Sequence, residues 1–262
     1  MKRFEKLRNT ATNEDYIVGI VDSKGPGGSH FQGEEYWTFS FSFYTWYKED
    51  KNVSNTSLYV YKEVEHSKVR ELMDKVKKES VIKIRIKCPI ENSRVELIDI
   101  EETDFYDEIL QPYLDEIKRE VAYIDDNLGT LVYDKGVEWF SKNMQWCSNY
   151  AELVFNTNDV DELKRMIRDY SFVLENNKEW DVKAREFAAL KLLDLKNDFW
   201  LDEDEAELTH SDFVNRIGLE SLSIESDGGL TFWFKDGDIF AGHVIIVKAN
   251  SNGEFLDAEM AG

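Results

Sequence analysis

The stretch Trp37-Thr-Phe-Ser-Phe-Ser-Phe43 carries the clearest structural signal in the sequence. Its aromatic residues alternate strictly with hydroxyl residues. A period of two places the aromatic side chains on one face of an extended chain and the hydroxyl groups on the other. The pattern therefore predicts a β-strand with one buried face.

Similar alternation occurs on both sides of this strand. It predicts further strands over residues 16–21, 58–64, 82–88 and 94–100. Between the third and fourth strands, residues 69–76 carry apolar side chains at helical spacing. Five short strands with a helix after the third is the element order of the OB-fold, so we predict an OB-like small β-barrel domain over residues 1–102.

From residue 103 the sequence becomes acidic and helical. Pro112 suits the first turn of a helix, which we expect to run to about Tyr123, and we predict an acidic helical linker over residues 103–127. Residues 128–262 combine short strands, glycine-containing turns and two amphipathic helices, the first of which Asn158 can cap. The expected fold class is α+β, with the barrel followed by an antiparallel sheet packed with a helical hairpin.

Charge is distributed unevenly along the chain. Residues 1–100 hold 17 basic and 16 acidic side chains, whereas residues 101–262 hold 15 basic and 37 acidic ones, so the two parts contribute +1 and −22 to the net charge of −21. One contribution is the acidic run at residues 202–207. Such a field disfavours contacts with phosphate and favours basic partners, although it also serves solubility alone.

The sequence points to a cytoplasmic protein. No apolar run approaches the roughly 18 residues of a membrane-spanning helix. The N-terminus MKRFEKLRNTATNED has charge but no apolar segment after it, so no secretory signal is expected. Cys88 and Cys147 are far apart and form no disulfide or metal pattern, which fits a reducing compartment.

A candidate ligand-binding site lies near the C-terminus. Asp236, Asp238 and His243 place two carboxylates and an imidazole within one hairpin, a combination that can hold a divalent cation or transfer protons. Trp233 and Gly242 belong to the same candidate set. The alternative is structural: Asp236 begins a turn, Asp238 bonds exposed backbone and Gly242 gives the backbone clearance.

No established catalytic motif is present in the sequence. It contains no His-Glu-x-x-His helix, phosphate-binding glycine loop, Gly-x-Ser-x-Gly elbow or Cys-x-x-Cys pair. We therefore assign no catalytic residue, metal or cofactor, and the interpretation leans towards a protein that is not an enzyme.

The predicted barrel offers a second candidate surface. Tyr59 and Tyr61 share one strand face, and Lys83, Arg85 and Lys87 share a face of another strand. Aromatic rings beside cations can bind single-stranded nucleic acid, but the near-zero charge of this segment argues against it. Alternating lysines on an exposed strand also prevent edge-to-edge pairing of sheets.

The C-terminal run at residues 233–245, Trp-Phe-Lys-Asp-Gly-Asp-Ile-Phe-Ala-Gly-His-Val-Ile, is followed by Asn252-Gly253 and Ala261-Gly262. It resembles the end of the bacterial domain of unknown function DUF2262. The segments that fit the same domain are Leu128-Gly-Thr-Leu131, Trp146 and Phe199-Trp200. The resemblance covers residues 128–262, and the N-terminal part is similar to the separate domain of unknown function often found ahead of it.

The resemblance implies an architecture and no particular chemistry. Ala241 stands where that family usually has an aromatic residue before the Gly-His pair, which speaks against a strict aromatic box. Related endings occur among bacterial proteins suspected of neutralising toxins, an analogy of fold and setting.

Our leading hypothesis is a cytoplasmic, non-enzymatic interaction protein that binds a basic protein partner, as an acidic inhibitor or immunity-type protein. One alternative is a metal-dependent hydrolase that uses Asp236, Asp238 and His243. The other is binding of single-stranded nucleic acid by the N-terminal barrel.

Overall fold

The computed structural model describes residues 13–202 and 205–262, which form two compact units. The first unit contains the chain up to Arg119 together with Lys135–Val137. The second contains Glu120–Asp134 and Glu138–Gly262. Most of the N-terminal stretch inspected for a secretory signal lies outside the described residues, as do Glu203 and Asp204 of the acidic run.

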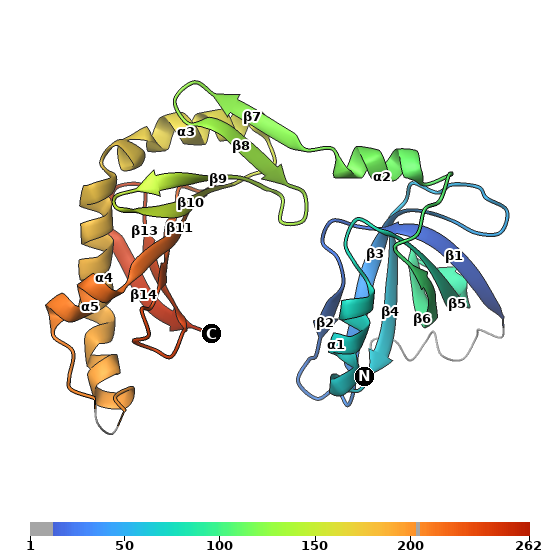
Figure 1. The fold of residues 1–262 in the computed structure, drawn as a ribbon, viewed down its shortest axis with the longest axis horizontal. Helices are drawn as coiled ribbons and strands as arrows, with labels where there is room; N and C mark the ends of the chain where they lie inside the picture. The colour runs from blue at the N-terminus through green and yellow to red at the C-terminus, as the bar shows by residue number, and fades with distance from the viewer. Residues whose placement is uncertain (1–12, 203–204) are drawn as a thin grey trace. The chain divides into compact units, whose positions relative to one another are not determined.

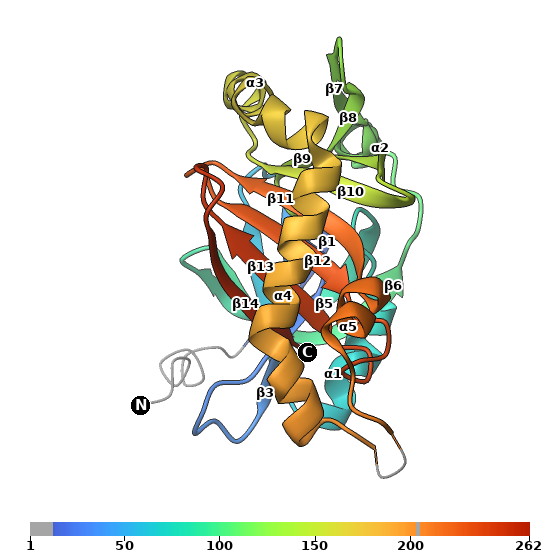
Figure 2. The same ribbon diagram turned by 90° about the vertical axis from the view of Figure 1, so that its left-hand side faces the viewer.

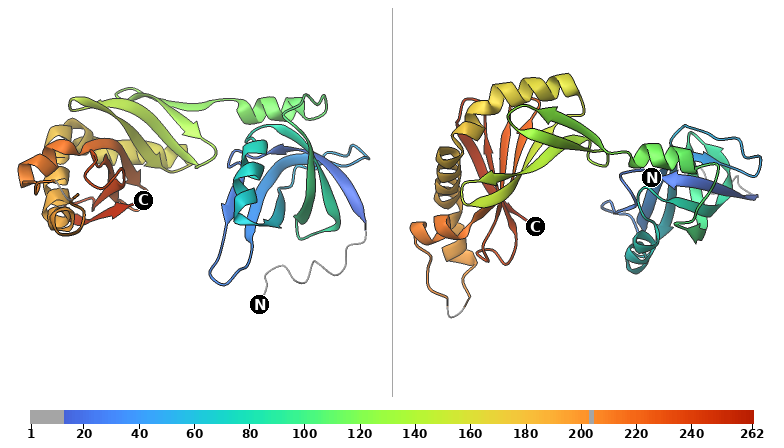
Figure 3. Two further views of the ribbon diagram at one scale, coloured as in Figure 1. Left: turned by 60° about the horizontal axis from the view of Figure 1, so that its bottom comes forward. Right: turned by 45° about the horizontal axis from the view of Figure 1, so that its top comes forward.

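A closed β-barrel forms the centre of the first unit (Figures 1 and 3). Its strands are β1 (Glu14–Val21), β3 (Trp37–Tyr47), β4 (Leu58–Val64), β5 (Val81–Glu91) and β6 (Arg94–Thr103). The order β1-β5-β6-β4-β3 closes because β1 also pairs with β3, and the short β2 (Gly27–Ser29) lies beside β3. The pair β4–β6 is parallel and the other pairs are antiparallel. Helix α1 (His66–Lys75) connects β4 to β5. This connectivity confirms the predicted OB-like barrel.

Alternation along β3 determines the interior of the barrel. Phe39, Phe41 and Phe43 are buried, and their rings contact one another in sequence, whereas Ser40 and Ser42 are partly exposed. Gly19 on the facing strand β1 makes room for this row. A Cβ atom there would lie 2.6 Å from the ring of Phe43, so a larger residue requires the ring to move.

The helix expected from Pro112 to about Tyr123 is shorter than predicted. Helix α2 (Gln111–Lys118) ends early, and Val121–Asp125 forms strand β7 of the second unit. The prediction was wrong at this end because Val121, Tyr123 and Ile124 favour extended structure, and pairing with strand β8 satisfies their backbone. The predicted linker segment is thus divided between the two units.

Helix α2 packs against the barrel. Leu110, Leu114 and Ile117 form a small apolar cluster with side chains of β1, β3 and β5. Asp107 holds the entry to the helix, because its carboxylate accepts hydrogen bonds from the backbone N–H groups of Ile109 and Leu110. The same carboxylate accepts a 2.6 Å hydrogen bond from the hydroxyl of Tyr47 on β3.

We expect Tyr47→Phe to lower the free energy of unfolding of the first unit by about 1.5 kcal/mol near pH 8, because it removes a hydrogen bond to a charged group. Burial, together with the hydrogen bond and the negative charge of Asp107, raises the pKa of Tyr47. The unfolded chain releases this proton near the ordinary tyrosine pKa of about 10, whereas the folded chain retains it. The contribution is therefore complete below about pH 10 and is lost as the pH rises further.

Urea denaturation at about pH 8 and about pH 10.5 measures this difference. Tyr44→Phe, at a tyrosine with 55% exposure on the same strand, is the control and should change little at either pH. A difference between wild type and Tyr47→Phe that stays constant over this range would contradict the prediction.

An eight-stranded sheet and three helices form the second unit. The strands are β7 (Val121–Asp125), β8 (Gly129–Asp134), β9 (Trp139–Trp146), β10 (Asn149–Asn156), β11 (Gly218–Glu225), β12 (Leu230–Lys235), β13 (Val244–Ala249) and β14 (Phe255–Ala261). They lie in the sheet in the order of the sequence. Neighbouring strands are antiparallel except β10 and β11, which are parallel. The barrel, this sheet and the helices confirm the α+β class.

The three helices connect the two strands of the parallel pair. They are α3 (Val160–Glu175), α4 (Asn177–Phe199) and α5 (His210–Arg216). Figure 2 shows α4 running across one face of the sheet, where it contacts β13 and β14. The core between them contains Phe155, Phe232 and Phe234 of the sheet and Ala184 and Ala188 of α4.

The two predicted long helices are present, but they meet at a bend. Only Asn176 separates α3 from α4, and the chain turns there (Figure 1). A helical hairpin needs a connection of a few residues to reverse the chain, and one residue does not supply it. The predicted cap Asn158 was also wrong by one position, because Asp159 caps α3 by accepting a 2.8 Å hydrogen bond from Glu162 N.

Helices in the described part of the chain were also compared with the requirements of a membrane span. None of them combines the necessary length with sufficient apolar character.

Candidate functional site

The predicted C-terminal site lies in the loop between β12 and β13. Asp236 directly follows β12 and is only 4% exposed. Its carboxylate accepts hydrogen bonds from the backbone N–H groups of Asp238 at 3.2 Å, Phe240 at 2.7 Å and Gly242 at 3.0 Å. The loop contains four residues with positive φ, at positions 237, 238, 241 and 242. Asp236 therefore holds a tightly curled loop by binding its amides.

The other members of the predicted set do not converge on Asp236. Asp238 is exposed, and the imidazole Nδ1 of His243 lies 2.5 Å from the carbonyl oxygen of Phe240. The edge of the His243 ring meets Trp200, with ring centroids 5.2 Å apart. Trp233 alternates with the buried Phe232 and Phe234 along β12, and its indole donates to Ser223 Oγ at 3.3 Å.

This geometry matches the structural interpretation of the loop. Within residues 13–202 and 205–262, no three His, Cys, Asp or Glu side chains are grouped so as to hold a metal ion. Ligand binding by Asp236, Asp238, Gly242, His243 and Trp233 stays a prediction.

On the outer face of the barrel, Tyr59 and Tyr61 are adjacent, with ring centroids 6.2 Å apart and an angle of 21° between the planes. The guanidinium of Arg94 lies over the ring of Tyr59, at 5.1 Å from its centroid. Sequence reasoning missed Arg94, because only the parallel pairing of β6 with β4 places it opposite Tyr59. Tyr61 is 3% exposed and offers little ring surface for stacking.

The three predicted cations on β5 already have partners. Arg85 binds Glu14 at 2.9 Å and Glu101 at 3.0 Å. Lys87 lies 3.4 Å from Glu96. Lys83 lies over the ring of Tyr16. Binding of phosphate to this face would have to displace these acidic groups, so single-strand binding stays a prediction without support from local charge.

Negative charge is concentrated where α4 ends. Residues 194–207 contain seven acidic side chains and one basic side chain, Lys196. Lys196 is 2% exposed, and its ammonium binds the carbonyl oxygen of Trp200 at 2.6 Å and the carboxylate of Glu205 at 2.5 Å. The hydrogen bond from Lys196 lowers the pKa of Glu205. The only cation of this segment therefore points inward.

Several carboxylates of this segment remain without a cation. Asp194, Asp198, Asp202 and Glu207 are exposed and make no ion pair within the described part of the chain. Phe199 lies among them and is 77% exposed. We call these five residues the acidic end of α4; Figure 2 shows where α4 ends and the chain continues to α5.

Carboxylates elsewhere on α3 and α4 are arranged differently. Asp161 pairs with Lys164, Glu162 with Arg165 and Glu179 with Lys183, each within one helical turn. The C-terminus of a helix also carries partial negative charge, so carboxylates placed there oppose its stability. Helix stability therefore does not explain the acidic end of α4.

Together these features define a two-domain α+β protein in which an OB-like barrel precedes a sheet covered by helices. The family described as "Uncharacterized protein conserved in bacteria (DUF2262)" matches residues 125–260, and the chain belongs to that family. Residues 2–117 match a second family, the domain of unknown function DUF7021. The resemblance inferred from the sequence is thereby confirmed.

Comparison with curated proteins gives no match. Among solved structures, the chain is similar to a crystal structure of a deletion mutant of the single-stranded DNA binding protein from Thermus aquaticus. The identity is 9%, the match covers 55% of this chain and 75% of that chain, and the TM-score is 0.22. A score of this size supports no argument about fold or function.

Proposed function

We propose that this chain is a non-enzymatic interaction protein whose second unit binds a basic protein partner through the acidic end of α4. The observation that carries the proposal is the group of four unpaired carboxylates around the exposed ring of Phe199. An inhibitor or immunity-type role is the form of the proposal that the resemblance to toxin-neutralising proteins favours.

Electrostatics gives the reason for a basic partner. The carboxylates repel one another and the helix terminus, and a bound cationic surface relieves both repulsions. Opposite charge also accelerates encounter, an effect that salt screens over about 8–10 Å. Phe199 adds an aromatic anchor of the kind that is enriched at protein interfaces.

The two alternative functions receive less support. The amide contacts of Asp236 use the carboxylate that a hydrolase would need, and the ion pairs of Arg85 and Lys87 occupy the cations that a nucleic acid would need. No contact of this kind occupies the carboxylates at the acidic end of α4 within the described residues.

The test compares two variants with equal net charge. One variant, Asp194→Asn/Asp198→Asn/Asp202→Asn, neutralises the acidic end of α4. The control, Asp161→Asn/Glu179→Gln/Glu259→Gln, neutralises three carboxylates that already have lysine partners. A basic protein captured by the wild type from an extract of the source organism is identified, purified and titrated against all three proteins by calorimetry.

We expect the first variant to weaken binding of that protein by about tenfold or more and the control by less than about twofold. The wild-type affinity should also fall as salt rises, and less steeply for the first variant. Equal affinities of the two variants, or the absence of any basic protein bound by the wild type at low salt, would overturn the proposal.

A further inference from the structure

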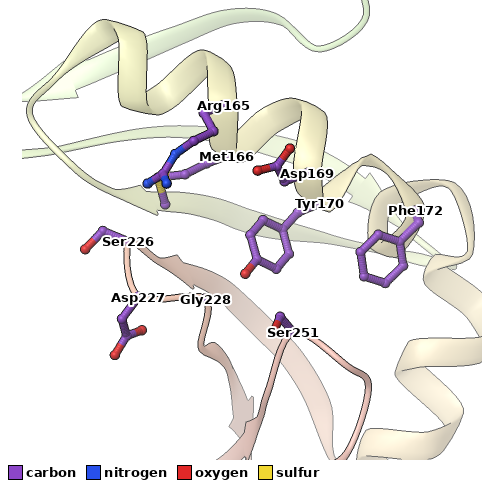
Figure 4. A pocket seen from close by; sticks show the side chains of 9 residues that line it. All are labelled: Arg165, Met166, Asp169, Tyr170, Phe172, Ser226, Asp227, Gly228 and Ser251. Carbon is purple, nitrogen blue, oxygen red and sulfur yellow. The ribbon is translucent and has the colours of Figure 1, made fainter.

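A small pocket of about 290 Å³ lies between α3 and two turns of the sheet (Figure 4). Helix α3 contributes Arg165, Asp169 and Tyr170 to its wall. The turn between β11 and β12 contributes Asp227 and Gly228, and the turn between β13 and β14 contributes Ser251. The pocket is at the α3 side of α4, away from the acidic end of that helix (Figure 1).

The hydroxyl of Tyr170 is directed into this pocket. The residue is 7% exposed and belongs to the apolar core of the unit. A Cβ atom on Gly228, where φ is +98°, would lie 3.0 Å from the hydroxyl oxygen, so the glycine allows the hydroxyl its position. Within the described residues the hydroxyl has no hydrogen-bond partner. Buried tyrosine hydroxyls usually have one, so this group is available to a ligand.

The charges around the pocket favour a cationic ligand. Burial raises the pKa of Tyr170, and the negative charges of Asp169 and Asp227 raise it further. The opposing charge of Arg165 is engaged by Glu162, with 2.8 Å between Nη2 and Oε1. One oxygen of Asp227 accepts a hydrogen bond from Gly229 N at 3.1 Å, and the other carboxylate oxygen has no partner among the described residues.

We propose that this pocket binds a guanidinium group. Its acceptors are the Tyr170 hydroxyl, the free oxygen of Asp227 and the hydroxyl of Ser251, which suit a planar group with several N–H donors. Phe172, which is 39% exposed, offers an aromatic ring at the pocket, and guanidinium stacks on such rings more readily than hydrated ammonium does. The volume lies just below the range of about 300–1,000 Å³ for sites of drug-sized ligands, which fits a group the size of one side chain.

This inference goes beyond the proposed function and does not rest on it, because its test uses a defined small molecule and no partner protein. Argininamide is titrated into the full chain by NMR or calorimetry, and norleucinamide, which lacks the guanidinium, is the control ligand. Tyr170→Phe removes only the hydroxyl and Asp227→Asn removes only the charge. Tyr150→Phe, at a tyrosine with 74% exposure outside the pocket, is the control variant.

We expect saturable binding of argininamide that weakens about fivefold in Tyr170→Phe and about tenfold in Asp227→Asn, with no change in Tyr150→Phe. Comparable binding of norleucinamide, no saturable binding of argininamide, or equal affinities of wild type and both pocket variants would overturn the inference. These outcomes are independent of the charge variants at the acidic end of α4, so either idea can fail alone.

A peptide with blocked ends and one internal arginine identifies the source of the guanidinium. Binding at least as tight as that of argininamide supports the inference with the arginine side chain of a protein as the ligand. Binding about tenfold weaker supports it with a free small guanidine as the ligand, because a backbone on both sides is then not accommodated.

Discussion

We expect Asp181→Ala to lower the free energy of unfolding of the second unit by about 3–5 kcal/mol, because it leaves a buried cation without its counter-ion. The carboxylate of Asp181, on α4, binds Arg185 Nε at 2.7 Å and accepts a 3.1 Å hydrogen bond from the indole of Trp146 on β9. Arg185 also donates to the carbonyl oxygens of Val214 and Ile217 beside α5. This network joins α4, the sheet and α5.

The measurement is urea denaturation followed by tryptophan fluorescence. Trp37 and Trp46 are the two tryptophans of the first unit, and the other five of the seven lie in the second unit. Glu179→Gln breaks the exposed pair with Lys183 two residues away and should cost less than about 1 kcal/mol. Adding Arg185→Met to Asp181→Ala should recover part of the loss, because the unpaired charge is then gone. A loss for Asp181→Ala as small as that of the control would refute this account.

The second large effect is expected for Asp236→Ala, about 2–4 kcal/mol of the free energy of unfolding of the second unit. The substitution removes the common acceptor of three backbone N–H groups in a loop where four residues have positive φ. Without that acceptor the curled backbone loses the contacts that offset its unfavourable conformation. Denaturation reports the size of the loss, and the NMR signal of the His243 ring reports the loosening of the loop.

Asp238→Asn is the matched control for Asp236→Ala. Residue 238 is exposed and has φ of +62°, a conformation that asparagine adopts readily, so the expected change is within about 0.5 kcal/mol. The pair also separates the structural role of Asp236 from the hydrolase hypothesis. Equal and small effects of the two substitutions would show that Asp236 does not hold the loop.

Much of the fold was accessible from the sequence, because alternation is a local signal. The aromatic row of β3, the strand at 58–64 and the helix after it were predicted from spacing alone, and the OB-like order followed. Strand β7 was missed because an acidic segment with a proline favoured a helix, whereas pairing with β8 decided the structure. The bend at Asn176 and the parallel pairing of β10 with β11 depend on tertiary contacts that no spacing encodes.

The candidate sites divide in the same way. Asp236 and His243 were found from their residue types, but their hydrogen bonds to loop backbone could not be predicted from spacing. Arg94 and Tyr170 were missed as site residues for a related reason. Tyr170 lies on the apolar stripe of α3 and was assigned to the core, and only the folded chain shows that its hydroxyl reaches Gly228. The Asp227-Gly228 turn was visible in the sequence, but its neighbour across space was not.

The parallel pair between β10 and β11 has a consequence during translation. Asn156 on β10 bonds Glu225 on β11 across 69 residues, and β11 is followed by three more strands of the same sheet. The barrel needs nothing beyond the first part of the chain apart from residues 135–137, so it can form while the ribosome is still synthesising the sheet. At typical elongation rates this interval is on the order of ten seconds, during which β7–β10 emerge without their central neighbour. A nascent chain arrested in that interval presents an open strand edge, the state in which a chaperone or a second polypeptide has the best opportunity to bind.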